Sequence, residues 1–187
     1  MNKIKSKQKQ PISKLELRIQ QANNYQFNPK QLTKHKITII KCSQMTSKQF
    51  EEVFQITKEN MYDLASKSSL GWEDSEKMEE MKQKDGFYIL FEEGFVCIRF
   101  EKHNKKFMCY LWEIQLKKQF HHQGIGTEMM NVIEKICKLT RCDELCLLCL
   151  HTNENAKKFY EKLGFDVSDK DSDGKDYIIF MKEFTYN

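Results

Sequence analysis

Two glycines, Gly124 and Gly126, stand directly before helix-forming residues in the stretch HHQGIGTEMMNVIEKI at positions 121–136. The whole chain has only 7 glycines, so two at one junction indicate a backbone that another group approaches closely. The first N–H groups of a helix have no partner within it, and the helix dipole adds positive charge there. The junction therefore predicts an anion site suited to a pyrophosphate.

This junction differs from two common nucleotide motifs. The run GIGTEMM lacks the Lys-Ser/Thr ending of a P-loop. The third glycine of a dinucleotide fingerprint is also missing, and the preceding strands are expected to be antiparallel. Because glycine pairs also serve in turns and caps, the neighbouring motifs have to identify the ligand.

A second candidate for chemistry is Glu113, a carboxylate between Trp112 and Ile114 on an otherwise apolar strand. Charged residues rarely lie in such a run without a purpose. Glu113 is therefore a candidate general base that acts directly or through water on an amine. An α-amine has a pKa of about 8, so a modest base suffices. The alternative is a strand-end charge that faces solvent or pairs with a lysine.

Hydrophobic periodicity predicts the elements that position these groups. We expect helices within residues 13–24, 46–67, 74–84, 124–140 and 153–164, and strands within 35–42, 86–93, 94–103, 105–118, 143–152, 165–168 and 175–184. Ser13 and Glu16 form a capping box for the first helix. The strands between residues 86 and 118 are typical of an antiparallel meander, and the apolar run 143–152 is typical of a central strand.

The composition predicts one soluble domain in a reducing compartment. The chain has 187 residues, 40% of them hydrophobic and 31% charged, and no apolar run approaches the ~20 residues that span a bilayer. The N-terminus lacks an apolar signal region, so we expect no secretion and read the seven cysteines as free thiols.

Charge is distributed unevenly along the chain. The first 48 residues hold 11 Lys and Arg and one acidic residue, whereas the remainder holds 20 basic and 26 acidic residues. We expect residues 1–12 to be a disordered basic arm and residues 13–187 to form one domain. The arm could contact nucleic acid or the ribosome, act as an import signal, or be a solvated terminus.

Two motifs in order identify a family. The loop His121-His122-Gln123-Gly124-Ile125-Gly126 precedes, after one apolar strand, a helix with matches at Asn153, Ala156, Phe159, Tyr160, Leu163, Gly164 and Phe165. Together they resemble the GNAT superfamily of acetyl-coenzyme A-dependent N-acetyltransferases, whose loop reads Arg/Gln-x-x-Gly-x-Gly/Ala. His121 departs from that pattern. The resemblance implies an α/β (α+β) GNAT fold: a mixed, mostly antiparallel sheet splayed into a V and flanked by helices.

Further stretches are similar to the N-alpha-acetyltransferase D enzymes, which acetylate histones whose tails begin Ser-Gly-Arg-Gly. They are ITKENMYDLASKSSLGWEDSEKMEEM, RFE at 99–101, CYLWEIQL and DYIIF, and the likeness runs from about residue 13 to residue 184. Two departures concern the substrate: Ala65 stands where that family has Tyr, and Leu70-Gly71-Trp72 stands where it has Trp-Gly-Trp.

The resemblance implies a cleft for acetyl-CoA between the strand with Glu113 and the strand with Leu148. The implied cofactor contacts are Ile114, Gln115 and Leu116 for the pantetheine arm, His121, His122, Gln123, Gly124, Ile125, Gly126 and Thr127 for the pyrophosphate, and Asn153 from the facing helix. Tyr160 matches a tyrosine that protonates the leaving thiolate in many members, although it could equally be a core aromatic.

The resemblance also implies a peptide groove. Glu101 matches an acidic residue that holds an arginine-bearing tail, and a bidentate pair would set its register. The aromatic residues Tyr110, Trp112, Trp72 and Tyr177 would line this groove, with a place in the core as the alternative for each and the favoured one for Trp72.

The expected function is acetyl transfer from acetyl-CoA to histone N-termini, by a monomer without metal or membrane contact, in nucleus and cytoplasm. One alternative is an acetyltransferase acting on lysine side chains or small amines, and another is a non-catalytic CoA-binding module. The spacing of Cys142, Cys146 and Cys149 imitates an iron–sulfur loop, but it falls in a strand. The run DKDSDG imitates a calcium loop without its glutamate.

Overall fold

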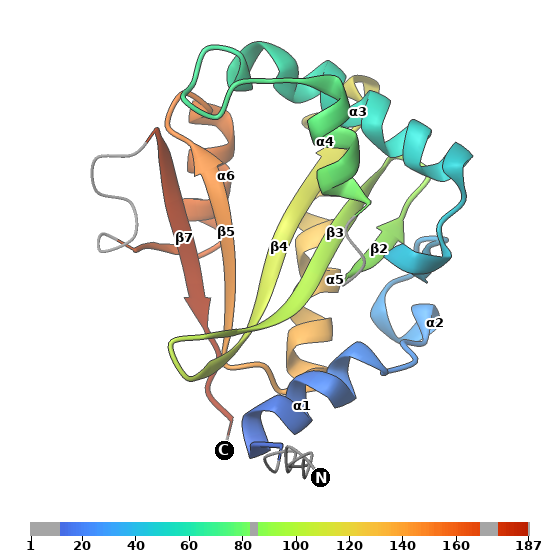
Figure 1. Ribbon diagram of the computed structural model, residues 1–187, viewed down its shortest axis with the longest axis vertical. Helices are drawn as coiled ribbons and strands as arrows, with labels where there is room; N and C mark the ends of the chain where they lie inside the picture. The colour runs from blue at the N-terminus through green and yellow to red at the C-terminus, as the bar shows by residue number, and fades with distance from the viewer. Residues whose placement is uncertain (1–11, 83–85, 169–175, 187) are drawn as a thin grey trace, which may run out of the picture.

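The computed structural model describes residues 12–82, 86–168 and 176–186 (Figure 1). Its elements are α1 (Lys14–Asn23), α2 (Pro29–Leu32), β1 (Thr38–Lys41), α3 (Ser47–Ala65), α4 (Asp74–Met81), β2 (Phe87–Leu90), β3 (Gly94–His103), β4 (Lys106–Leu116), α5 (Ile125–Thr140), β5 (Glu144–Leu150), α6 (Glu154–Lys162), β6 (Asp166–Val167) and β7 (Tyr177–Glu183), with 3-10 turns at Cys42–Gln44 and Lys118–Phe120. The expected helices and strands are confirmed, apart from their ends.

Two local differences have simple causes. The first strand is shorter than predicted, and a one-turn helix, α2, was not predicted, although Asn28 caps it and Pro29 occupies its first turn. The capping box of Ser13 and Glu16 is confirmed. The expected basic arm, apart from Ile12, and the run DKDSDG lie outside the described residues.

The sheet has the strand order β1-β2-β3-β4-β5-β7-β6. Only β4 and β5 pair in parallel, so the predicted mixed, mostly antiparallel sheet is confirmed. The parallel pairing joins residues 108–111 of β4 to residues 144–147 of β5 and then stops, although both strands continue. The strands therefore diverge into a V, which opens upward in Figure 1.

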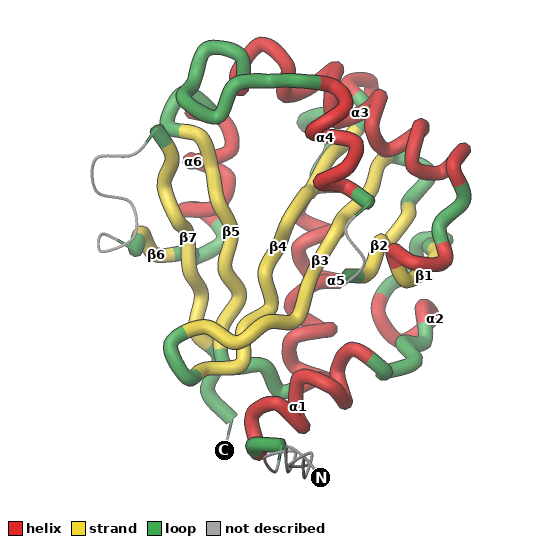
Figure 2. Tube along the Cα trace, viewed as in Figure 1, coloured by secondary structure: helices red, strands yellow, loops and turns green. Residues whose placement is uncertain are grey.

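Two apolar cores hold the helices to the sheet. One core joins the sheet to α1, α2, α5 and α6, and the other joins it to α3 and α4 (Figure 2). Helix α5 buries Met129, Val132, Ile133 and Ile136 at helical spacing, and each buried side chain of this size contributes roughly 1.5–3 kcal/mol. This burial fixes the N-terminus of α5, and with it the glycine loop, against the sheet.

Helix α1 packs on the body through Leu15, Ile19 and the buried Ala22. Arg18 adds a salt bridge of 2.9 Å to Asp143, which immediately precedes β5. The seven cysteines are buried, and none of them forms a disulfide. Within the described residues, no helix combines the length and apolar composition needed to cross a bilayer, and no cluster of three or more His, Cys, Asp or Glu suits a metal ion.

Candidate active site

A β-bulge in β4 sets the direction of the site residues. The register against β3 shifts at the Cys97–Ile98 step, which leaves Trp112 as an extra residue. Leu111 and Ile114 pack on the core beside α5, whereas Trp112 packs on the core beside α3 and Glu113 pairs with a lysine of α4. Trp112 and Glu113 are therefore consecutive residues on one face, at the point where β4 leaves β5.

The end of β4 pairs with β3 but not with β5, and two side chains hold it in place. The carbonyl of Leu116 accepts a hydrogen bond of 2.8 Å from the Asn60 side chain of α3. Nε2 of His121 lies 3.0 Å from the same oxygen. This strand end is therefore positioned before any ligand binds, and it is the segment that the family resemblance implies for the pantetheine arm.

The glycine loop suits an anion. Gly124 is the N-cap of α5 and has a φ of 82°, a left-handed conformation that favours glycine. A Cβ at this position would meet no atom within 4 Å, so space is open above the first turn. The Thr127 N–H donates to the Gly124 carbonyl at 3.0 Å, whereas the earlier N–H groups of that turn, at Ile125 and Gly126, have no acceptor within the helix. The predicted pyrophosphate position therefore has both donors and room, in agreement with a diphosphate ligand.

Side chains of the same loop turn onto their own backbone. His121 contacts the Leu116 carbonyl, as described above, and Gln123 donates to the Gln119 carbonyl at 2.8 Å. His122 is exposed with a φ of 60°. Asn153, predicted to contact the cofactor, is the N-cap of α6, and its side chain accepts from the Ala156 N–H. Backbone N–H groups are thus the phosphate donors that this geometry offers.

Glu113 lies in a polar network that the sequence did not predict. Its side chain is 10% exposed, and Oε1 lies 2.7 Å from Lys77 Nζ of α4. Its other oxygen, Oε2, accepts from Gln115 Nε2 at 2.8 Å. Gln115 in turn accepts from Asn60 at 3.1 Å, and Lys77 also pairs with Glu80 at 2.9 Å. Glu113 therefore pairs with a lysine, as the alternative for this residue predicts. Its carboxylate still lies inside the site.

Tyr160 is buried under the sheet among Phe159, Phe165 and Phe180, with ring centroids 5.3–5.8 Å from its own. Burial, with smaller effects from Cys149 and Glu113, raises the pKa of its phenol well above the ordinary value. The phenol is therefore protonated at neutral pH. Tyr160 is thus packed in the core, and its protonated hydroxyl also suits a proton donor.

The face of Glu113 carries most of the residues predicted for the peptide groove. Tyr110 and Trp112 contact each other with ring centroids 5.4 Å apart, and Arg99 lies 3.9 Å from the Trp112 ring centroid. Burial, then Cys146 and the carboxylates of Glu101, Glu113 and Glu80, raises the pKa of Tyr110. Three carboxylates are therefore close enough to this phenol to raise its pKa.

Trp72 and Tyr177 belong to other elements, the loop between α3 and α4 and strand β7. The Trp72 ring packs on Phe54 and Tyr62, and its N–H donates to Asp74 at 2.7 Å. These contacts agree with the alternative that Trp72 is part of the core. Tyr177 begins β7 opposite Leu150, at the open end of the V.

Two hydrogen bonds, which we call the clasp, join Ser69 and His151 to Asp176 directly before β7. The Ser69 N–H, in the loop between α3 and α4, donates to the side chain of Asp176 at 2.5 Å. The carbonyl of Asp176 accepts from the His151 N–H at 2.9 Å. The Ser69 hydrogen bonds hold the pKa of Asp176 below its ordinary value. The loop that carries Leu70 and Trp72 is therefore anchored to the start of β7.

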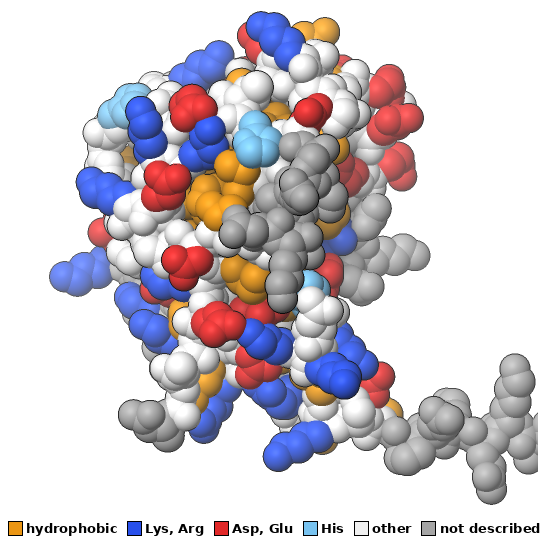
Figure 3. All heavy atoms as spheres, turned by 90° about the vertical axis from the view of Figure 1, so that its left-hand side faces the viewer, with side chains coloured by type: hydrophobic (Ala, Val, Ile, Leu, Met, Phe, Trp, Pro, Cys, Tyr) orange, Lys and Arg blue, Asp and Glu red, His pale blue; other side chains and the backbone are white. Residues whose placement is uncertain are grey.

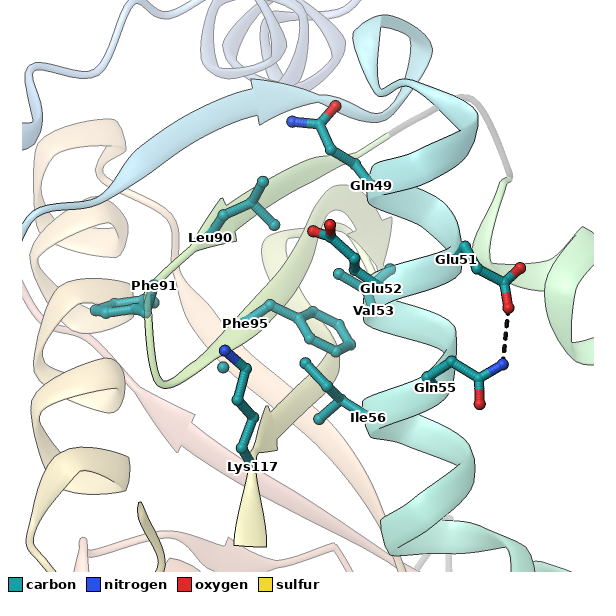
Figure 4. Close-up of a pocket in the computed structure, with 11 residues that line it drawn as sticks. Gln49, Glu51, Glu52, Val53, Gln55, Ile56, Leu90, Phe91, Phe95 and Lys117 are labelled. Carbon is teal, nitrogen blue, oxygen red and sulfur yellow. Dashed lines mark hydrogen bonds between the residues drawn. The ribbon is translucent and has the colours of Figure 1, made fainter. Parts of the chain in front are cut away.

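The pocket in Figure 4 lies outside the candidate site. Figure 4 shows a pocket of about 370 Å³ between α3 and the β2–β3 turn, lined by Val53, Ile56 and Phe95, among others, and by no residue predicted for the site. Figure 3 shows the face around β7, where acidic and basic side chains mix over the upper part. The splayed strands, the glycine loop and Glu113 thus mark one candidate active site.

The chain belongs to the acetyltransferase (GNAT) family, whose model matches residues 50–165. Among curated proteins, it is similar to N-alpha-acetyltransferase 50 of Danio rerio, with 32% identity over 75 residues, which are 40% of this chain and 45% of that protein. The chain thus matches about half the length of this relative.

Solved structures share the fold. The PaiA N-acetyltransferase of Thermoplasma acidophilum, in complex with coenzyme A, is 20% identical with a TM-score of 0.58 over 80% of this chain and 99% of its own. Naa50 of Arabidopsis thaliana, in complex with the bisubstrate analogue CoA-Ac-MVNAL, is 17% identical with a TM-score of 0.55 over 79% and 99%. At these identities the likeness concerns the fold alone, and it confirms the predicted GNAT fold.

Proposed function

We propose that this protein transfers the acetyl group of acetyl-CoA to the α-amine of a protein N-terminus. The observation that carries the proposal is the position of Glu113. It lies on the aromatic face of β4, where the strand leaves β5 and its edge becomes available to a thioester-bearing arm. Family membership and the open N-terminus of α5 support acetyl-CoA as the acetyl donor.

The residues divide the proton transfers between two faces of the sheet. Glu113 accepts one proton from the α-ammonium, and the amine lone pair then forms a C–N bond with the acetyl carbonyl carbon. The C–S bond breaks as the tetrahedral intermediate collapses, and the Tyr160 hydroxyl gives its proton to the sulfur. The second amine proton replaces the proton lost by Tyr160, and Glu113 releases its proton to solvent.

The charge of the acceptor face favours a cationic peptide. Glu80, Glu101 and Glu113 lie close enough to Tyr110 to raise its pKa, they outnumber the cations Lys77 and Arg99 of this face, and a carboxylate can bind an arginine side chain in a bidentate manner. We therefore propose histone tails of the Ser-Gly-Arg-Gly type as the substrate class. Ala65 is buried at the end of α3, and Leu70 is exposed in the α3–α4 loop that the clasp anchors. These two departures from the N-alpha-acetyltransferase D pattern therefore concern the part of the groove beside that loop.

A pair of peptides tests this substrate class. One is a Ser-Gly-Arg-Gly peptide with a free N-terminus, and the other has a blocked N-terminus and one lysine. Lysine has a pKa of about 10.4 against about 8 for the α-amine, so its neutral fraction at pH 7 is about 10²-fold smaller. Without a stronger base, kcat/KM is expected to favour the free N-terminus by about that factor. Acetylation of the blocked peptide alone would replace the proposal with a lysine acetyltransferase.

Replacing Tyr160 with phenylalanine separates its two roles. The ring packing is kept and only the hydroxyl is lost, so the thermal unfolding midpoint is expected to change little. The kcat is expected to fall by about 10- to 10²-fold, at or below the lower end of what a positioned proton donor contributes, because a thiolate leaves readily. Steady-state kinetics and thermal denaturation measure the two effects. A kcat equal to that of the parent protein would assign Tyr160 to the core alone.

A further inference from the structure

Lys77 of α4 forms salt bridges with both Glu113 and Glu80. Its Nζ lies 2.7 Å from Glu113 Oε1 and 2.9 Å from Glu80 Oε1, and its side chain is 17% exposed. Burial alone would lower the pKa of Lys77, but the two carboxylates outweigh burial and raise it. Lys77 is therefore an ammonium group shared between two anions.

In this arrangement the acceptor amine must compete with Lys77 for contact with Glu113. Glu113 already contacts Lys77 through one oxygen and Gln115 through the other. Gln115 is buried and is held by Asn60, so it has little freedom to move away. Lys77 differs because its second anion, Glu80, lies on the next turn of the same helix and is 36% exposed. The lysine can leave Glu113 without losing a counter-ion.

We propose that Lys77 is an exchangeable counter-ion that holds the Glu113 carboxylate in position until the ammonium of the acceptor replaces it, while Glu80 receives the displaced lysine. The inference rests on the proposed function of this site and extends it. No bond is made or broken in this exchange, since one ammonium takes the place of another. Lys77 is thus a positioning residue and Glu80 its second contact.

The environment of Glu113 contains further charged and titratable groups. They are Lys77 and Glu80 from α4, Tyr88 from β2, Cys97, Arg99 and Glu101 from β3, Tyr110 from β4 and Tyr160 from α6, while α3 presents the neutral Asn60. The phenols and the thiol of this set have raised pKa values and stay neutral at pH 7. Lys77 forms a direct salt bridge with Glu113, so its removal is expected to change the environment of that carboxylate strongly.

Carboxyl-carbon NMR of the ¹³C-glutamate-labelled protein tests the inference without catalysis. The Glu113 signal is assigned with Glu113→Gln, and it is then titrated in Lys77→Met and in Glu80→Gln. Loss of the ammonium should let Glu113 take up a proton at higher pH, by about one unit or more, because an opposite charge at this distance has effects of that size. Glu80→Gln leaves Lys77 to Glu113 alone, so its titration should move to lower pH.

Two further variants and a kinetic measurement complete the test. Lys77→Arg should restore the titration of the parent protein, and Lys82→Met, at the exposed end of the same helix, should leave it unchanged. In steady-state kinetics, Glu80→Gln should raise KM for the peptide more than it lowers kcat, since the displaced lysine has lost its second contact. Equal Glu113 titrations in Lys77→Met, Glu80→Gln and Lys82→Met would overturn the inference. Absence of acetyl transfer by the parent protein would instead overturn the proposed function, and the titrations would still report on the ion pair.

Discussion

Replacing Glu113 with glutamine is expected to lower kcat for acetyl transfer by about 10²- to 10⁴-fold, the range that a positioned general base contributes. Glutamine keeps the size of the side chain and its place beside Gln115, but it cannot accept the amine proton. Because the glycine loop and α5 are untouched, the dissociation constant for coenzyme A should stay near that of the parent protein. Steady-state kinetics and calorimetric titration with coenzyme A measure the two quantities.

A matched control removes a carboxylate elsewhere. Glu52 lies on α3 with a side chain that is 63% exposed, so Glu52→Gln should leave both kcat and coenzyme A affinity unchanged. Thermal denaturation of both variants shows whether loss of the Lys77 ion pair alters folding. If Glu113→Gln folds and turns over at the rate of the parent protein, Glu113 is not the base. Its ion pair with α4 would then be structural.

Local signals predicted the frame of this site well. Gly124 and Gly126 identify the start of a helix because glycine has a short-range conformational reason to be there, and the buried run of β5 follows from its composition. The V could be expected only through the family resemblance. Its direct cause is the short parallel pairing of β4 with β5, which depends on residues far apart in the chain.

The network around Glu113 could not be predicted, for the same reason. Asn60 lies 55 residues before Gln115, and Lys77 is one of several charges on a helix whose periodicity does not single it out. The bulge at Trp112 arises from the register between β3 and β4, and no single residue of β4 marks it. These contacts come from the packing of α3 and α4 over the sheet, and they decide which face Glu113 points to.

The loop side chains show a related limit. The motif aligned His121 with the Arg or Gln of the family pattern, and side-chain contact with the phosphate was one expectation from it. In the structure, the ring contacts the Leu116 carbonyl and so supports the strand end. A pattern of residue types identifies this loop because backbone N–H groups, rather than particular side chains, form the expected phosphate site. It does not determine where each side chain turns.

Replacing Gly126 with valine is expected to give the largest loss of acetyl-CoA affinity of any single change in the loop. A Cβ at this position would lie 3.4 Å from the Phe159 ring and 3.7 Å from Leu116, and the two methyl groups of valine need space beyond that. They would push against α6 or toward the amides that a diphosphate needs. We expect KM for acetyl-CoA to rise by about 10²-fold, equivalent to the loss of a few kcal/mol.

Two smaller variants distinguish steric blocking from backbone strain. At Gly124 an added Cβ meets no atom within 4 Å, so Gly124→Ala acts only through its φ of 82°, at a cost of roughly 1–2 kcal/mol in local conformation. Gly126→Ala has an ordinary φ and adds only the Cβ contacts with Phe159 and Leu116, so its effect should be smaller than that of valine. Coenzyme A titrations of the three variants give the order. If Gly126→Val binds coenzyme A as tightly as the parent protein does, the diphosphate does not lie on this helix, and the cofactor would have to be sought elsewhere in the V.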